Sequence, residues 1–304
     1  MEKYNFTTDE NCIDMRIDKY LTELMPDTSR SHIQKLLRDS NILVNGEIVK
    51  PSYKLQLDDE IEVTIPEPIE ANIEPEKMDL DIIYEDDDVI IVNKPKNMVV
   101  HPAPGHYTGT LVNGLMYHCK DNLSNINGVL RPGIVHRIDK NTTGALIVCK
   151  NDKSHNDIAK QLAEHTIERT YVGIVIGNLA DDEGLIDQPI GRDPKDRKKM
   201  SVNLDGKRAI THYKVLKRFK NYNYVQFNLE TGRTHQIRVH MKSINHPLLG
   251  DEIYNNMKLK FNLNGQCLHA KTIGFTHPST KEYVEFDTEV PEYMKHLLDV
   301  LEKQ

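Results

Sequence analysis

The sequence predicts an α+β fold in two domains: a small domain with two helices and a β-hairpin, then a larger one on a mixed, mainly antiparallel sheet. Two observations lead to this prediction. Strand-like apolar runs outnumber helical patterns in the second part of the chain, and an acidic segment with three prolines interrupts the apolar patterning after the first part. We therefore place the domains at residues 14–66 and 79–304, with a linker at 67–78.

The small domain is predicted from local signals. Residues 15–25 carry apolar side chains at helical spacing, and a second helix is expected within residues 29–39, with a serine or threonine available to cap it. Asn45-Gly46 then joins two short strands, which is the strongest local signal for a hairpin. Residues 59–66 alternate between polar and apolar side chains and predict a further strand.

The larger domain is expected to contain more strands than helices. Its apolar or alternating runs predict strands within residues 89–95, 145–150, 170–177, 211–219, 223–231 and 282–290. Helical patterns occur within residues 110–119, 156–166, 231–244 and 291–303.

The bulk composition describes a globular protein with reduced cysteines. The chain has 304 residues, of which 38% are hydrophobic and 28% are charged. No apolar stretch approaches the ~20 residues that a membrane helix needs, and the N-terminus lacks a signal-peptide pattern. The four cysteines form no Cys-x-x-Cys pair, which favours a cytoplasmic location and argues against a zinc site.

The charges are distributed unevenly along the chain. The net charge is −7, yet residues 192–220 carry eleven basic and three acidic side chains, whereas residues 67–89 carry ten acidic and one basic. A basic segment in an acidic protein is typical of a surface that binds nucleic acid. A solvated surface loop has the same composition, so this pattern alone leaves both interpretations open.

Asp139 is the residue whose surroundings most suggest chemistry. It follows Arg137 and precedes an apolar run that is typical of a buried strand. A carboxylate can act as a nucleophile if it stays ionised, and burial without a nearby cation would neutralise it. The distant segment 230–241 supplies Arg233 and Arg238 as candidate partners. A structural ion pair would use the same residue types, so this pattern does not decide between the two.

Two other chemistries fit the sequence less well. A serine or threonine hydrolase would need a nucleophile within reach of a base, and no G-x-S-x-G elbow is present. A metal site could use histidines such as His101, His106, His118 and His136, but the chain has fourteen histidines and none of the usual ligand spacings.

Five segments in order resemble the motifs of the RluA-type pseudouridine synthases, in particular members that modify large-subunit ribosomal RNA. They are VIIVNKPKNMVVHPAPGH, GIVHRIDKNTTGALIVCKND, ERTYVGIVIG, TGRTHQIRVHMKSINHPLLGD and LHAKTIGFTHPSTKE. The small domain resembles the RNA-binding domain first seen in a small-subunit ribosomal protein. The resemblance implies an isomerase that converts uridine to pseudouridine in RNA without a metal or cofactor, and we expect a monomer. Transfer RNA as substrate, or a catalytically silent RNA-binding factor, remain alternatives.

The resemblance also implies roles for individual residues. Asp139 matches the catalytic aspartate, Tyr171 the tyrosine that stacks on the base, and Arg238 the basic residue that pairs with the aspartate. Arg137 matches the arginine that helps to extrude the target uridine, because a base inside a helix is inaccessible. Further residues are expected to contact RNA: His136, Arg233 and His235 in the larger domain, and Arg30, Ser31, Lys35, Arg38, Asn45 and Lys50 in the smaller one.

Overall fold

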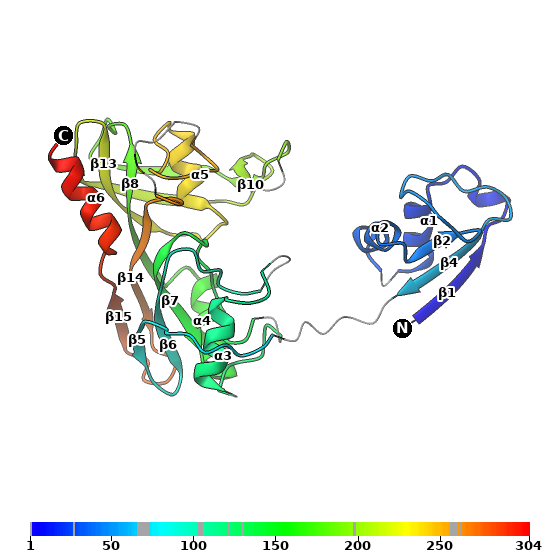
Figure 1. The fold of residues 1–304 in the computed structure, drawn as a ribbon, viewed down its shortest axis with the longest axis horizontal. Coiled ribbons are helices and arrows are strands. Elements are labelled where there is room, and N and C mark those ends of the chain that lie inside the picture. The colour runs from blue at the N-terminus through cyan, green and yellow to red at the C-terminus, as the bar shows by residue number, and fades with distance from the viewer. Residues whose placement is uncertain are drawn as a thin grey trace. The chain divides into compact units, whose positions relative to one another are not determined.

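The computed structural model describes residues 2–26, 28–65, 73–102, 106–120, 122–128, 131–196, 199–255, 261 and 263–304. The chain folds as two compact units, Met1–Ala71 and Asn72–Gln304, each with its own apolar core (Figure 1). The predicted α+β class, with a small αα-β domain before a larger sheet domain, is confirmed. Much of the predicted linker, residues 67–72, lies outside the described residues.

The N-terminal unit is an antiparallel sheet with two α-helices. Its elements are β1 (Glu2–Thr7), a short 3-10 helix (Glu10–Cys12), α1 (Ile17–Leu24), α2 (Arg30–Arg38), β2 (Ile42–Val44), β3 (Glu47–Ile48) and β4 (Glu60–Ile65). The strand order is β1-β4-β2-β3, so β1 pairs with β4 at one side of the sheet. Both helices, the hairpin and β4 lie where the sequence predicts them, whereas β1 was not predicted.

Two local interactions set the course of this unit. The Ser29 side chain accepts a hydrogen bond from the backbone of His32 and so caps α2. Asn45 and Gly46 both adopt the left-handed conformation, with φ of 52° and 78°, which the two-residue turn between β2 and β3 requires.

The second unit is built on a nine-stranded sheet. Its strands are β5 (Ile82–Glu85), β6 (Val89–Lys94), β7 (Thr143–Cys149), β8 (Glu168–Ile176), β9 (Glu183–Asp187), β12 (Ile210–Arg218), β13 (Tyr222–Leu229), β14 (Leu268–Thr276) and β15 (Tyr283–Asp287). The order is β5-β6-β7-β14-β8-β13-β12-β9, with β15 also paired to β14. Because only β7 and β14 run parallel among these pairs, the sheet is mixed and mainly antiparallel, as predicted. A separate hairpin consists of β10 (Ile190–Arg192) and β11 (Met200–Val202).

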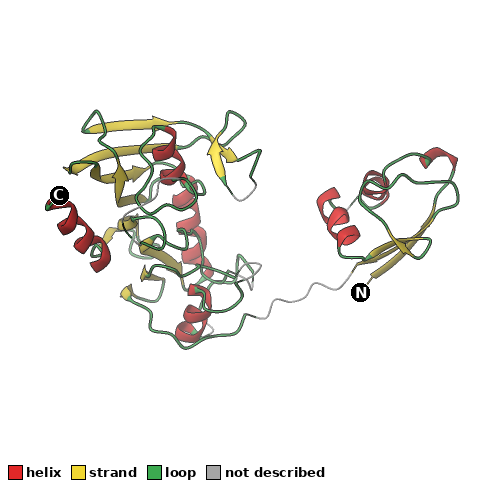
Figure 2. Ribbon diagram, turned by 45° about the horizontal axis from the view of Figure 1, so that its top comes forward, coloured by secondary structure: helices red, strands yellow, loops and turns green. Residues whose placement is uncertain are grey.

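Four helices flank this sheet, and Figure 2 distinguishes them from the strands. They are α3 (Leu111–Cys119), α4 (Asp152–Ala163), α5 (Gln236–Ser243) and α6 (Glu292–Glu302). Helices α3 and α5 pack into one apolar core together with Ile90 and Val92 of β6, whereas α4 packs into another with Val89 and Ile91. Since alternate residues of a strand point to opposite faces, β6 is covered on both. The central strands form a rigid platform for the loops at their ends.

The second unit begins before residue 79, because part of the predicted linker packs against α3. Ile73 is only 5% exposed and belongs to the same apolar core as α3. The Glu76 carboxylate accepts hydrogen bonds from the backbone of Gly109, and the Glu74 carbonyl accepts one from Asn113. These contacts fix residues 73–76 to the second unit.

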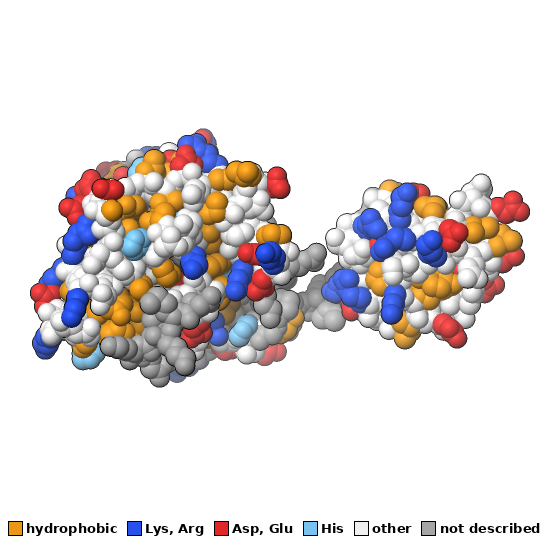
Figure 3. All heavy atoms as spheres, turned by 90° about the horizontal axis from the view of Figure 1, so that it is seen from above, with side chains coloured by type: hydrophobic (Ala, Val, Ile, Leu, Met, Phe, Trp, Pro, Cys, Tyr) orange, Lys and Arg blue, Asp and Glu red, His pale blue; other side chains and the backbone are white. Residues whose placement is uncertain are grey.

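Basic side chains gather on one face of the N-terminal unit (Figure 3). All six residues of this unit that are expected to contact RNA are exposed: Arg30, Ser31, Lys35, Arg38, Asn45 and Lys50. The guanidinium of Arg30, however, binds the fully buried carboxylate of Asp18. Asn45 uses its side chain within the fold, donating to Asp59 and accepting from the backbone of Glu60.

Asp18 is expected to make the stability of this unit depend on pH. Burial alone would raise the pKa of Asp18, but hydrogen bonds from Arg16, Gln34 and Arg30 outweigh burial and lower the pKa to about 2. The pKa of an aspartate in the unfolded chain is about 3.9. The stabilisation that ionised Asp18 gives to the fold is therefore complete above about pH 4 and is lost as the pH falls toward about 2. Asp18→Ala should lower the free energy of unfolding by about 1–3 kcal/mol at neutral pH. Urea unfolding of residues 1–71 across pH measures both effects, and an unchanged midpoint in the variant would contradict them.

Candidate active site

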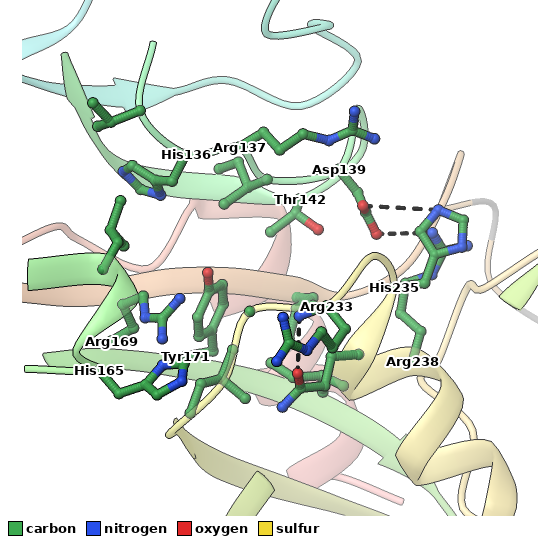
Figure 4. A pocket seen from close by; sticks show the side chains of 18 of the residues that line it. His136, Arg137, Asp139, Thr142, His165, Arg169, Tyr171, Arg233, His235 and Arg238 are labelled. Carbon is green, nitrogen blue, oxygen red and sulfur yellow. Dashed lines mark hydrogen bonds and ion pairs between the residues drawn. The ribbon is translucent and has the colours of Figure 1, made fainter. Parts of the chain in front are cut away.

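A cavity of about 500 Å³ lies between the loop before β7, strand β8 and the segment that begins α5. The loop contributes Asp139, β8 contributes Tyr171 and α5 contributes Arg238, so three distant parts of the sequence meet here (Figure 4). The lining includes four arginines and one aspartate: Arg137, Arg169, Arg233, Arg238 and Asp139. The cavity is therefore locally cationic, although the whole chain carries a net charge of −7.

Arg238 joins two carboxylates. Its Nη1 donates to Oδ2 of Asp139 at 2.9 Å, and its Nε and Nη2 donate to the two oxygens of Asp251 at 2.7 and 2.9 Å. The side chains of Arg238 and Asp251 are 5% and 0% exposed, whereas that of Asp139 is 18% exposed. The bidentate pair with Asp251 thus fixes the guanidinium in the interior, and Asp139 alone reaches the cavity.

Electrostatics keep this guanidinium charged. Burial disfavours the charged form of Arg238, but the hydrogen bonds to Asp251 and the charges of Asp139 and Asp251 outweigh burial and raise its pKa above the ordinary value. A buried cation thus lies 2.9 Å from the Asp139 carboxylate and holds that carboxylate in place.

At the start of α5, the side chains of His235 and Arg238 both face Asp139. His235 adopts the left-handed conformation, with φ of 57°, immediately before the helix. Its Nε2 lies 3.8 Å from Oδ1 of Asp139, and its Nδ1 lies 2.7 Å from the hydroxyl of Tyr254. The Gln236 side chain accepts hydrogen bonds from Thr231 and from the backbone of Arg233, which ties the preceding turn to the helix.

The loop that carries Asp139 is held at both ends. The backbone N–H of Ile147 donates to Nε2 of His136 at 2.9 Å, and burial together with the charge of Arg169 lowers the pKa of His136 to about 3. His136 therefore acts here as a neutral acceptor that fixes the loop to β7. The backbone of Thr142 donates to the carbonyl of Asp139, which closes a tight turn directly after the aspartate.

Lys94, which the sequence pattern does not single out, also supports the loop that carries Asp139. Its side chain is fully buried, and its ammonium group donates to the carbonyls of Pro95, Met98 and Lys140 at 2.8–3.0 Å. Burial lowers the pKa of Lys94 to about 7, while the charge of Asp139 acts in the opposite direction. Three carbonyl acceptors match the three protons of the charged form, so this geometry favours the ammonium ion.

Tyr171 lies on β8 with its ring in the cavity and its hydroxyl directed toward the side of the Asp139 loop, where Thr142 lies (Figure 4). The residue is 9% exposed. Burial, the largest influence, raises the pKa of the Tyr171 hydroxyl; the Arg169 charge opposes this shift and the Asp139 charge adds to it. At neutral pH the hydroxyl is therefore protonated and can donate a hydrogen bond or a proton.

The remaining expected residues lie at the rim of the cavity. Arg137 is exposed and also borders a second cavity of about 340 Å³ on the other side of Asp139. Arg233 is half-buried, and its Nε donates to the carbonyl of Arg208. Sequence reasoning missed Lys94, Asp251 and a buried arginine, Arg169. Among the described residues, no group of three or more His, Cys, Asp or Glu side chains could hold a metal ion, and no helix is long and apolar enough to cross a membrane.

Comparisons with known proteins agree with this geometry. The chain matches the RNA pseudouridylate synthase family over residues 88–243 and the S4 domain over residues 15–61. A relative from Bacillus subtilis (strain 168), named "Uncharacterized RNA pseudouridine synthase YlyB", is 54% identical over 100% of this chain and 99% of its own length. The chain therefore belongs to the RNA pseudouridine synthase family, whose members are isomerases, and it carries an N-terminal S4 domain.

Two further similarities extend this result. A protein of Zymomonas mobilis named "Ribosomal large subunit pseudouridine synthase D" is 43% identical over 97% of this chain and 96% of its own length. The solved structure of human RNA Pseudouridylate Synthase Domain Containing 1 covers 76% of this chain with a TM-score of 0.59. At 22% identity that structure shows a likeness of fold alone.

Asp251 should prove as necessary for the site as the residues that line the cavity. Asp251→Ala leaves the buried guanidinium of Arg238 with one carboxylate and should destabilise the second unit by about 3–5 kcal/mol. The single-turnover rate should fall as well, because Arg238 is no longer held against Asp139. Asp251→Asn keeps the shape and one acceptor oxygen, so we expect an intermediate effect. Urea unfolding and single-turnover kinetics of both variants check this, and full activity in the alanine variant would exclude a positioning role.

Proposed function

We propose that this protein isomerises uridines in large-subunit ribosomal RNA, with Asp139 as the group that acts on the nucleotide. The observation that carries the proposal is the geometry of Asp139: a partly exposed carboxylate at the wall of a cavity, held by a buried guanidinium at 2.9 Å. The name of the Zymomonas mobilis relative supports the choice of RNA. We propose that the protein needs no metal or cofactor, because isomerisation involves no net redox change or hydrolysis. We also propose that it acts as a cytoplasmic monomer.

The cavity has the parts that the reaction needs. The target uridine must leave its helix to reach Asp139, and the exposed Arg137 at the rim is placed to occupy the space that it leaves. The ring of Tyr171 offers a surface on which the flipped uracil stacks. After the glycosidic bond breaks, the base turns within the cavity and a carbon–carbon bond forms from C5 of the uracil to the sugar.

Each residue in this scheme has a distinct task. Arg238 holds Asp139 in place through an ion pair, and His235 offers a second polar group to the same carboxylate. Tyr171, protonated at neutral pH, can hold or donate a proton near the base but is unsuited to act as a phenolate base. Buried walls retain the detached uracil, so that it rejoins the sugar instead of diffusing away.

Removal of the carboxylate tests the proposal directly. Asp139→Asn is nearly isosteric, but an amide can serve neither as nucleophile nor as base, so pseudouridine formation should be abolished. RNA binding should persist because it is distributed over many phosphate contacts. Pseudouridine mapping of total RNA should show large-subunit sites that vanish when the gene is removed, return with the wild-type gene, and stay absent with the Asp139→Asn gene.

The same mapping separates the alternatives. Loss of pseudouridine only from transfer RNA would replace the proposed substrate, and an unchanged map would indicate an RNA-binding factor without activity. Restoration of the sites by Asp139→Asn would overturn the assignment of Asp139.

The N-terminal unit is expected to serve binding and not chemistry. Its exposed basic residues suit phosphate contacts. Removal of residues 1–71 should leave the single-turnover rate at saturating RNA unchanged, raise Kd, and flatten the slope of log K against log salt by ~0.7–0.9 per lost contact. Removal of residues 1–75 instead deletes Ile73 from the core and should destabilise the second unit.

Filter binding and single-turnover kinetics across a salt series measure these effects. Equal Kd and equal salt slope in the full-length and 1–71-deleted proteins would show that the unit does not bind this RNA. A rate that collapses at saturation would show that the unit helps to build the active site.

A further inference from the structure

Among the residues that the structure describes, no carboxylate neutralises the buried guanidinium of Arg169. It is 9% exposed and lines the cavity beside Tyr171 (Figure 4). Its Nη2 donates to the backbone carbonyl of Glu230 at 3.3 Å, while its Nε has no hydrogen-bond partner among the described residues. Arg238, the other buried arginine of the cavity, is held by two carboxylates.

This arrangement differs from that of a structural ion pair. A buried charge that stays unpaired is costly, and a structural arginine is usually neutralised by aspartate or glutamate. The influences on the pKa of Arg169 are burial, which lowers it, then Tyr171 and Arg233; no carboxylate is among them. Residue 232 is a glycine, which leaves room for the guanidinium of Arg169. A Cβ at this position would lie only 2.6 Å from Nη1 of Arg169. A group that fills the cavity can therefore supply the negative partner that the described residues do not offer to this guanidinium.

The position of Arg169 indicates which part of the substrate supplies that acceptor. Arg169 and Tyr171 are two residues apart on β8, so their side chains emerge on the same face of the strand. A uracil that stacks on Tyr171 would therefore turn one edge toward Arg169. The exposed Arg137 and the half-buried Arg233 are at the rim, so they are better placed for phosphate contacts.

We propose that Arg169 is a catalytic residue that donates a hydrogen bond to an exocyclic oxygen of the flipped uracil and stabilises the negative charge that forms on it. This inference rests on the proposed function. It adds a second role for a guanidinium in the cavity: Arg238 acts on the enzyme's carboxylate, and Arg169 acts on the base.

The electron balance of the reaction places negative charge on O4 by either route, and on O2 as well when the C1′–N1 bond breaks first. In that first route the electron pair of the C1′–N1 bond stays on the uracil and is shared between N1, O2 and O4. If Asp139 instead adds to C6, the electron pair of the C5–C6 double bond moves to O4 as an enolate. In both cases the base carries negative charge before C5 bonds to C1′. Afterwards C5 loses its proton and N1 gains one, and in the second route the bond between Asp139 and C6 breaks, which restores the carboxylate. A fixed cation at this edge lowers the energy of the negatively charged base more than that of neutral uridine.

Kinetics of Arg169 variants of the full-length protein test the proposal. Arg169→Met removes the charge and keeps a long apolar side chain, and it should lower the single-turnover rate at saturating RNA by about 10²-fold with little change in Kd. Arg169→Lys, which keeps the charge, should recover part of the rate. Lys295→Met removes one positive charge on α6, where Lys295 pairs with Glu289 and Glu292, and it should behave like wild type.

Substrates with a single oxygen replaced identify the contact. RNA fragments that carry 2-thiouridine or 4-thiouridine at the mapped position offer a sulfur, a weaker acceptor, in place of O2 or O4. One of the two should slow the wild-type enzyme, and the same replacement should cost nothing further in Arg169→Met. Such non-additivity shows that the side chain and the oxygen interact directly.

Other results would overturn the proposal in distinguishable ways. A normal rate at saturation with a raised Kd and a salt slope flatter by ~0.7–0.9 would show that Arg169 binds a phosphate. Two outcomes would show a structural role. One is that Arg169→Met and each thio substitution have additive effects on the rate. The other is a rate loss that tracks a lower melting temperature and is not improved in Arg169→Lys. If wild-type protein forms no pseudouridine in the fragment, while the Asp139→Asn control is equally inactive, the proposed function fails and not the inference about Arg169.

Discussion

The ion pair between Asp139 and the buried Arg238 is the interaction on which the rest of the site depends. The guanidinium is 5% exposed and needs an acceptor for each edge, while the Asp139 carboxylate, 18% exposed, gains a fixed cation as its partner. Asp251 satisfies one edge and leaves the other for Asp139. The sheet makes this possible, because its rigid strands hold the Asp139 loop and helix α5 at a separation that one hydrogen bond spans.

The cavity divides its charges by function. Arg238 is neutralised within the protein, whereas Arg169 keeps its charge for the ligand, so the same residue type serves the enzyme's carboxylate in one place and the substrate in the other. Burial keeps His136 neutral and Tyr171 protonated, so neither adds a charge to the cavity at neutral pH. A base that becomes anionic while it is stacked on Tyr171 therefore meets the uncompensated charge of Arg169.

Local patterns predicted the Asn45-Gly46 turn, the helices and the central apolar strands, but not β5, β9, β10 or β11. The pairing of Asp139 with Arg238, 99 positions away, followed from the family resemblance, because the residue pattern left Arg233 open as well. Strand β1 was missed because only Tyr4 and Phe6 of its six residues are apolar, which is too short a pattern to stand out. Asp251, Lys94 and Arg169 were missed because each is an ionisable residue near an apolar run, and only the folded chain shows what it faces.

The hairpin of β10 and β11 has a connection to the carboxylate that no local pattern indicates. The backbone of Met200 donates to the Tyr254 hydroxyl at 2.9 Å, and that hydroxyl lies 2.7 Å from Nδ1 of His235. The Tyr254 hydroxyl already accepts from Met200, so its own proton has an acceptor only if it donates to Nδ1 of His235. The proton of the neutral His235 ring then lies on Nε2. That nitrogen faces Asp139 at 3.8 Å, and burial, the main influence, lowers the pKa of His235. The hairpin thus selects the neutral tautomer of His235 that presents an N–H donor to Asp139. In this way the geometry of a basic surface segment is linked to the surroundings of the Asp139 carboxylate.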